Sequence, residues 1–303
     1  MEGAYYDGRL NEEAFLAQLD YYARFCRGIL ASGNIQYMGR EDERVKTTCQ
    51  EEIAAETQCA VFTFMADSIP VQVTADSIGY HLPFSYNYDD YTGNKDWSNM
   101  FVTTLMQTGK GNCHSMPLLY KLIMDRLGQE SWLALAPNHL YIKAYSKQTN
   151  WYNIELTCGD CPTDAWLMAS GYIHLDAVRN GIYMDTLSVR QSVALCLTDL
   201  AQGYMHKYGI RNGHFILQCL NTALKYYPHY INALLLKADI ITALYQESPS
   251  PQGKEKIDAL YSRIHQLGYR RMPEKMYLRW LHSLKEEYSQ RHSIQRMIKD
   301  RVQ

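Results

Sequence analysis

The sequence predicts an α+β protein, with a mixed domain over residues 1–185 followed by an all-helical repeat domain over residues 186–303. The first part alternates segments of helical periodicity with short Val- and Tyr-rich runs typical of strands, whereas the chain after about residue 189 keeps helical periodicity throughout. A length of 303 residues is enough for about two domains. No long Gly/Ser- or Pro-rich linker separates the two domains, so we expect the helical domain to dock rigidly against the mixed domain. It would then form one wall of the path by which a substrate approaches, or cover that path.

Apolar residues at spacings of three and four predict a helix near the N-terminus, with Asn11 as its cap and Gly33 as its stop. A second helix is expected over residues 51–65, ending before Pro70. Residues 70–94 lack helical periodicity and are expected to form a long loop with one short strand. The apolar stripe of the first helix consists of Phe15, Leu19, Tyr22, Cys26, Ile29 and Leu30.

The middle of the chain predicts a helix, a glycine turn and a second helix in succession. They are expected over residues 97–107, 108–112 and 113–128, so that Cys113 opens the second helix. Two short β-like runs follow, over residues 140–145 and 151–156. The polar residues between these runs have the length of a hairpin loop, which predicts an antiparallel pair.

The C-terminal part predicts five helices separated by Gly- and Pro-containing breaks. Two helix starts echo each other, Tyr227-Pro228 and Met272-Pro273, and lie 45 residues apart (228 to 273). Tandem helix pairs are the signature of an α-solenoid segment, whose units stack to bury a continuous core. The expected helices span residues 188–208, 214–227, 230–245, 255–267 and 274–289.

The composition excludes several classes of function. The 30 Lys and Arg residues are balanced by 32 Asp and Glu, so no basic field is present to hold a nucleic acid or a membrane surface. No apolar run approaches the roughly 18 residues of a membrane span. The first residues lack the basic and apolar regions of a signal peptide, so we expect a cytoplasmic protein, with an extracytoplasmic location left open.

One cysteine differs from the rest. The eight cysteines lie at irregular spacings, unlike a disulfide framework, and most are expected to be buried thiols. Cys113, however, is expected at a helix N-terminus directly after a glycine turn, within Gly111-Asn112-Cys113-His114-Ser115. The unpaired backbone donors there favour a thiolate and can lower a cysteine pKa from about 8.5 to roughly 3.5–7.5. The same N–H groups could hold an oxyanion once the sulfur attacks a carbonyl.

A cysteine nucleophile needs a base, and the base needs an orienting group. His139 enters the first β-like run and Glu155 lies near the end of the second, so a hairpin would bring the two together. In this arrangement Cys113 attacks, His139 accepts and returns the proton, and Glu155 holds the imidazole tautomer. Each residue also has a structural interpretation, as a buried thiol, a polar core histidine or a solvated strand carboxylate. Their order along the chain favours a catalytic triad.

These elements resemble the transglutaminase-like branch of the papain-type fold. In that family a Gly and a Cys open a helix that ends in Leu-Gly, a His enters a strand, and a Trp-containing strand ends in an acidic residue followed by Thr or Pro. Pro137-Asn138-His139 and the helical tail resemble the bacterial subgroup that joins such a domain to tetratricopeptide-like repeats. The resemblance covers roughly residues 85–165 and, more loosely, 190–245. The matching segments are Gly111–Cys113, Leu127-Gly128, His139 and Trp151–Thr157.

The resemblance implies a thiol-dependent acyl-transfer enzyme, a peptidase, amidase or transglutaminase-type protein with a Cys113–His139–Glu155 triad. Its substrate would be a peptide or protein amide, and no cofactor is implied. Most relatives have Asp where this chain has Glu155, so the orienting carboxylate needs a slightly more distant histidine. Gln107 matches the spacing of the oxyanion glutamine of papain-like proteases, and a glutamine at a helix end explains it equally well.

A non-enzymatic alternative stays open, in which the helical repeats bind a peptide or protein partner and the first domain is a retained scaffold. An open cleft to the sulfur would favour the enzyme and a plugged one the scaffold, with residues 86–91 and Trp132 as candidate walls or plugs. Cys158-Gly-Asp-Cys161 lacks the second pair that a zinc site needs, and the tyrosine-rich run lacks EF-hand spacing. We therefore expect no metal.

Overall fold

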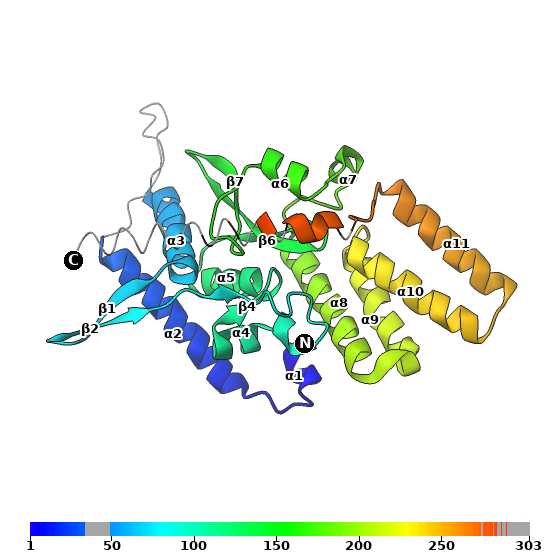
Figure 1. Cartoon of the computed structure of the whole chain (residues 1–303), viewed down its shortest axis with the longest axis horizontal. Coiled ribbons are helices and arrows are strands. Elements are labelled where there is room, and N and C mark those ends of the chain that lie inside the picture. The colour runs from blue at the N-terminus through cyan, green and yellow to red at the C-terminus, as the bar shows by residue number, and fades with distance from the viewer. Residues whose placement is uncertain (34–48, 274, 281, 284–285, 287–288, 290–303) are drawn as a thin grey trace. The chain divides into compact units, whose positions relative to one another are not determined.

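The computed structural model describes residues 1–33, 49–273, 275–280, 282–283, 286 and 289 (Figure 1). The α+β class is confirmed, with small sheets and helices in the N-terminal part and a series of helices toward the C-terminus. The described elements form two compact units. The helical unit contains Met1–Glu12, Ala134–Pro137 and Tyr172–Arg271; the mixed unit contains Glu13–Leu133, Asn138–Gly171 and the described residues from Met272 onward. The boundary near residue 185 stays a prediction.

Two helices open the mixed unit, and both were expected. α2 (Glu12–Ala31) buries the predicted stripe, including Leu19, Tyr22 and Cys26. α3 (Cys49–Ala66) follows, and its Phe64 is fully buried in a cluster of aromatic rings. The rings of Phe64 and His81 stack at a centroid distance of 4.5 Å, and Tyr22 packs on Phe64 at 5.0 Å. This cluster fixes the helices to the chain that leads toward Cys113.

The segment expected to be a loop with one strand contains three short strands instead. β1 (Ile69–Thr74) and β2 (Ser77–His81) form an antiparallel hairpin, and β3 (Ser85–Tyr86) follows. The expectation was wrong because most residues of the hairpin are exposed. Its strands are held by backbone hydrogen bonds, and an exposed ribbon does not need the alternation of apolar and polar residues by which strands are recognised.

The chain then approaches Cys113 through two short helical segments. The helix expected over residues 97–107 is interrupted at Phe101, where the backbone is extended, so that η1 (Trp97–Met100) precedes α4 (Val102–Thr108). β4 (Lys110–Gly111) pairs in parallel with β3. α5 (Ser115–Arg126) begins two residues after Cys113 and ends two residues before Gly128.

The antiparallel hairpin predicted downstream is confirmed. β6 (His139–Ser146) pairs with β7 (Asn150–Ile154) in a register that places Ile142 opposite Ile154. A third strand that the sequence analysis missed, β5 (Trp132–Ala136), gives the sheet the order β5–β6–β7. It was missed because most of its residues are buried, so it forms a short continuous apolar run without alternation. The short helix α6 (Asp164–Ser170) follows β7.

The helical unit carries consecutive helices, as expected. After α1 (Glu2–Tyr5) and α7 (Leu175–Arg179), helices α8 to α11 pack in sequence, each against the next (Figure 1). α11 begins earlier than expected because Ser250 caps it and Pro251 occupies its first turn, where no backbone donor is needed. The bounds are α8 Val189–Tyr208, η2 Gly209–Asn212, α9 Gly213–Tyr226, α10 Ile231–Glu247 and α11 Pro251–Gln266.

The fifth expected helix, over residues 274–289, lies partly outside the described residues. Residues 275–280 are helical, and they belong to the mixed unit rather than to the helices that precede them. Among the helices that the structure describes, none has the length and apolar character needed to cross a membrane.

The close packing at Gly111 gives a test of this architecture. A Cβ added there would lie 2.7 Å from the Ser115 Oγ and 2.8 Å from the Leu105 Cδ1. We expect Gly111→Ala to lower the free energy of unfolding by about 1–3 kcal/mol, because overpacking must displace α4 or α5. Gly28→Ala is the matched control, since its added Cβ meets no described atom within 4 Å beyond its own stretch of helix, and α2 should gain up to about 1 kcal/mol. Urea denaturation measures both, and equal midpoints would contradict the packing.

Candidate active site

The structure brings together the three residues singled out from the sequence. The Nε2 atom of His139 contacts the Oε2 atom of Glu155 in a buried, hydrogen-bonded pair. Cys113 interacts with the same imidazole from the turn before α5. The exposed fractions are 7% for Cys113, 4% for His139 and 1% for Glu155. A thiol, an imidazole and a carboxylate therefore form one group that is shielded from solvent.

The β6–β7 hairpin explains why His139 meets Glu155. His139 is the first residue of β6, and Glu155 directly follows the last residue of the antiparallel partner β7. Glu155 and Asp160 then exchange two backbone hydrogen bonds of 2.8 and 3.0 Å, which turn the chain back. The backbone N–H of Thr157 donates to the Glu155 Oε1 at 2.9 Å. Both carboxylate oxygens are thus engaged, which fixes the orientation of the group that faces the imidazole.

The turn that carries Cys113 is held by a reciprocal cap. The fully buried Asn112 accepts hydrogen bonds at its Oδ1 from the backbone N–H groups of His114 and Ser115, each at 3.0 Å. In return the Asn112 N–H donates to the Ser115 Oγ at 3.1 Å. This is the geometry of a capping box, and it closes the first turn around Cys113.

This cap changes one expectation about oxyanion binding. Several donors at the helix start were expected to be open, but Asn112 occupies those of His114 and Ser115. The N–H of Cys113 itself makes no hydrogen bond within the described part of the chain. The N–H of Cys113 is therefore the backbone donor in this turn that can hydrogen-bond to an oxyanion.

The electrostatics of the group favour a thiolate beside an imidazolium. Burial alone would raise the pKa of Cys113, but the adjacent His139 outweighs it and the net shift is downward. For His139, burial disfavours the charged form, while the negative charges of Glu155 and Cys113 outweigh it and raise the pKa to about 10. Burial likewise opposes ionisation of Glu155, and its contacts with His139 and Thr157 lower the pKa nonetheless. An opposite charge in a dry site acts with little screening.

The pairing of His139 with Glu155 also decides which nitrogen can serve the sulfur. Because Nε2 faces the carboxylate, Nδ1 is left for Cys113, and Nδ1 is buried without any other hydrogen bond in the described residues. The Cys113 Sγ lies 3.8 Å from the carbonyl oxygen of Asn138, whose positive φ of 55° turns the chain into β6. Asparagine is among the residues that tolerate this conformation.

Tyr86, one of the tyrosines expected to wall the site, lies against the thiol. β3–β4 pairing sets Tyr86 opposite Gly111, two residues before Cys113. Burial and the neighbouring Cys113 raise the pKa of the Tyr86 hydroxyl. The rest of the tyrosine-rich loop is organised by Asp90, whose carboxylate accepts from the N–H groups of Lys95 and Asp96 at 3.1 and 2.9 Å. The Asp90 carboxylate oxygens thus order the loop itself. This agrees with a loop that lines the site and not with a calcium-binding loop.

The sequence analysis missed the two aromatic residues that cover the group. The ring of Trp280 meets the ring of His139 nearly at a right angle, with 4.6 Å between the centroids, and Trp280 is 4% exposed. Tyr277 packs beside it at 5.7 Å. In Figure 1 the helical turn that carries them, coloured red, lies against β6. The available signal was the spacing of two aromatics three residues apart, which was attributed to a further helical repeat.

Other candidates from the sequence are not brought to this group. Gln107 is exposed on α4, and Trp132 packs instead against Trp151, at 5.0 Å between the ring centroids. Cys158 is buried and Cys161 is exposed, and both remain thiols. Among the residues that the structure describes, no cluster of His, Cys, Asp and Glu could hold a metal ion.

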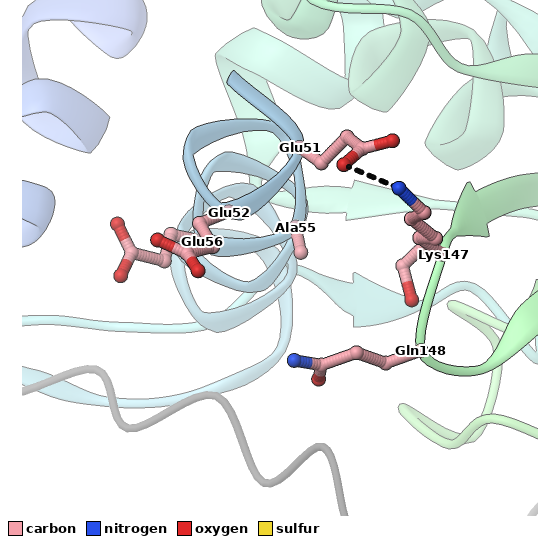
Figure 2. Close-up of a pocket in the computed structure, with 7 residues that line it drawn as sticks. Glu51, Glu52, Ala55, Glu56, Lys147 and Gln148 are labelled. Atoms are coloured by element: carbon pink, nitrogen blue, oxygen red, sulfur yellow. Dashed lines mark ion pairs between the residues drawn. The ribbon is translucent and has the colours of Figure 1, made fainter. Parts of the chain in front are cut away.

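Two hollows in the mixed unit lie outside the group. One, of about 50 Å³, lies between α3 and the loop after β6; Figure 2 shows Glu51 reaching toward Lys147, with 3.5 Å between the charged atoms, while Glu52 and Glu56 point away from that lysine. The other, of about 1140 Å³, is mainly apolar and lies between α2, α3 and β1. None of the three triad residues lines either hollow.

Comparison of the chain with family models, with curated proteins and with solved structures finds no match. The interpretation of this group of residues therefore depends on its own geometry and chemistry, and the transglutaminase-like resemblance stays a hypothesis.

The ion pair predicts a distinct pH dependence of stability. The lowered pKa of Glu155 contributes stability above its unfolded value of about 4.3, which is lost as the pH falls through the folded value. The raised pKa of His139 contributes stability below its unfolded value of about 6.5, which is lost as the pH rises toward the folded value of about 10. We expect Glu155→Gln to cost about 3–5 kcal/mol, with the largest deficit between about pH 4.3 and 6.5.

Denaturant unfolding of both proteins from pH 3 to 9 measures this difference. The control is Asp160→Asn, which removes an exposed carboxylate from the same turn and should leave the profile unchanged. A deficit for Glu155→Gln that does not vary with pH would contradict a charged His139–Glu155 pair.

Proposed function

We propose that this protein is a thiol-dependent acyl-transfer enzyme that acts on an amide, with Cys113 as nucleophile, His139 as acid and base, and Glu155 as the orienting carboxylate. The observation that carries the proposal is the buried His139–Glu155 pair beside a cysteine whose pKa is lowered. A structural cysteine in an apolar core has the opposite shift, as Cys26 does, whose pKa burial raises to about 12.

The reaction would proceed in two halves. The Cys113 thiolate attacks the carbonyl carbon of the amide, and the resulting oxyanion is stabilised by the open N–H of Cys113. His139 Nδ1 gives its proton to the leaving nitrogen as the C–N bond breaks, which leaves a thioester on the sulfur. Water or an amine then attacks the thioester while His139 takes up its proton, and the thiolate departs. Glu155 keeps the imidazole in the required orientation throughout both halves.

The proposed substrate class is a peptide or protein amide, and none of these steps requires a cofactor. Peptide hydrolysis, deamidation and cross-linking share the chemistry up to the thioester. They differ in the leaving group and in whether water or an amine reaches the thioester. The proposal therefore covers peptidase, amidase and transglutaminase-type reactions as members of one mechanism.

The pH profile of Cys113 alkylation tests this proposal. Iodoacetamide labelling from pH 5 to 10, resolved by peptide mapping, should give a midpoint for Cys113 below the ordinary thiol value of about 8.5. In His139→Ala the midpoint should rise above that value, because burial then acts without the opposing charge. The exposed Cys161 serves as the reference thiol in the same molecules. The midpoint reports the ionisation of the thiol and not its accessibility.

The decisive result is the comparison between the two proteins. A wild-type midpoint at or above that of Cys161, unchanged by His139→Ala, would refute an activated nucleophile. The complementary assay is incubation with 4-nitrophenyl acetate, which should acetylate Cys113 in the wild type, with turnover lost in Cys113→Ser.

One observation favours the alternative class, a binding protein without catalysis. Cys113 is 7% exposed and Trp280 packs on the neighbouring His139 ring, and a permanently plugged site serves no substrate. In that case the consecutive helices α8 to α11 would present the surface for a peptide or protein partner. Absence of acetylation even after the cover is removed by mutation would favour this alternative.

A further inference from the structure

The cover over the candidate site is a short helical turn with one aromatic face. The carbonyl of Pro273 accepts from the N–H groups of Met276 and Tyr277, at 2.8 and 3.1 Å, and starts the turn. Tyr277 and Trp280 are three residues apart, so they share one face of the helix. Lys275 and Arg279 are exposed. The segment thus has the pattern of an amphipathic element bound to an apolar surface.

The surface beneath this turn is built from rings and sulfur. Trp280 packs on the His139 ring and on the buried Cys158, and Trp166 borders the same cluster. Tyr277 meets the ring of Tyr91 at 5.8 Å. Burial raises the pKa of the Tyr277 hydroxyl, and the negative charge of Cys113 adds to the rise. The cover therefore packs directly on the ring of the candidate base.

One polar atom indicates that this arrangement is not a permanent core. The Nε1 atom of Trp280 is buried without a hydrogen-bond partner in the part of the chain that the structure describes. Buried donors and acceptors that stay unsatisfied cost free energy, which native cores avoid. Displacement of the cover would release the Trp280 N–H to solvent and free the face of the His139 ring for an amide substrate.

Attack also requires the reacting carbon within about 3.5 Å of the sulfur, which the cover prevents while it is seated. We propose that residues 272–273 and 275–280 are a built-in competitor of the substrate, packed on the His139 ring of the candidate site and displaced by a peptide amide that carries an aromatic side chain. This inference rests on the proposed function and adds its regulation and substrate class. Tethering gives such a segment an effective concentration on the order of millimolar, so that weak contacts keep the site closed. An aromatic side chain in the substrate would replace the edge-to-face ring contacts that are lost when the cover is displaced.

Site-resolved alkylation of the full chain tests the cover. We expect Trp280→Ala, and more mildly Tyr277→Ala, to accelerate Cys113 labelling by about tenfold at a fixed pH, through loss of aromatic contacts. The matched control is Trp151→Ala, which removes a half-exposed tryptophan that packs on Trp132 and Tyr145. It should leave the Cys113 rate unchanged. The fully buried Cys26 reports unfolding, and it should stay unlabelled in each variant.

Protection experiments test the substrate class. In the Trp280→Ala protein, N-acetyl-tryptophan amide and N-acetyl-tyrosine amide should slow Cys113 labelling at concentrations where N-acetyl-leucine amide has little effect. Protection by the leucine compound equal to that by the aromatic ones would overturn the assignment of an aromatic substrate.

The outcomes separate this inference from the proposed function. Unchanged Cys113 rates in both folded cover variants, with a low-pKa profile retained, would overturn the competitor and leave the enzyme standing. Faster labelling with an ordinary thiol profile would support the cover and refute the activated nucleophile. If Cys26 becomes labelled in Trp280→Ala, the half-buried Tyr277→Ala decides the question, and its failure to accelerate Cys113 labelling counts against the competitor.

Discussion

The buried contact between His139 and Glu155 is the interaction on which the rest of the site depends. Taking two charges out of water is expensive, and the cost is recovered only where geometry and additional hydrogen bonds are good. Here the β6–β7 hairpin brings the two side chains into contact from adjoining strand ends, and the Thr157 N–H satisfies the second carboxylate oxygen. With Glu155 in place the imidazole can hold a proton, and that proton in turn stabilises a thiolate at Cys113.

The second requirement is a rigid turn that presents the sulfur to this pair. Asn112 and Ser115 close the turn through reciprocal hydrogen bonds, and Gly111 lets α4 and α5 approach it closely. The same glycine pairs with Tyr86, which brings a phenol to the far side of the thiol. Sheet pairing, a helix cap and a small residue thus act together on one backbone segment, and none of them alone would fix the position of Cys113.

The site combines charges that favour a thiolate with little access for solvent. The first property is expected of an enzyme and the second of a binding scaffold, the two classes of function that the sequence left open. An activated thiol has no use in a core, while a cover limits the access of substrate to it. The proposed displaceable cover would reconcile the two, because the Tyr277–Trp280 face packs on rings yet leaves the Trp280 indole N–H unsatisfied. The free-energy cost of a charged pair in so dry a place is the reason to propose the enzyme over the scaffold.

The sequence by itself determined the mixed class, the main helices, the β6–β7 hairpin and the three chemical groups, because periodicity, turn residues and chain order are local signals. It misjudged features that depend on distant partners. The exposed hairpin of β1 and β2 and the buried strand β5 lack the alternation that reveals strands. Two expected oxyanion donors are taken by Asn112, and Gln107 points to solvent. Only the tertiary structure placed Trp280 on His139, because that contact joins residues more than a hundred positions apart and leaves no periodic trace in the chain.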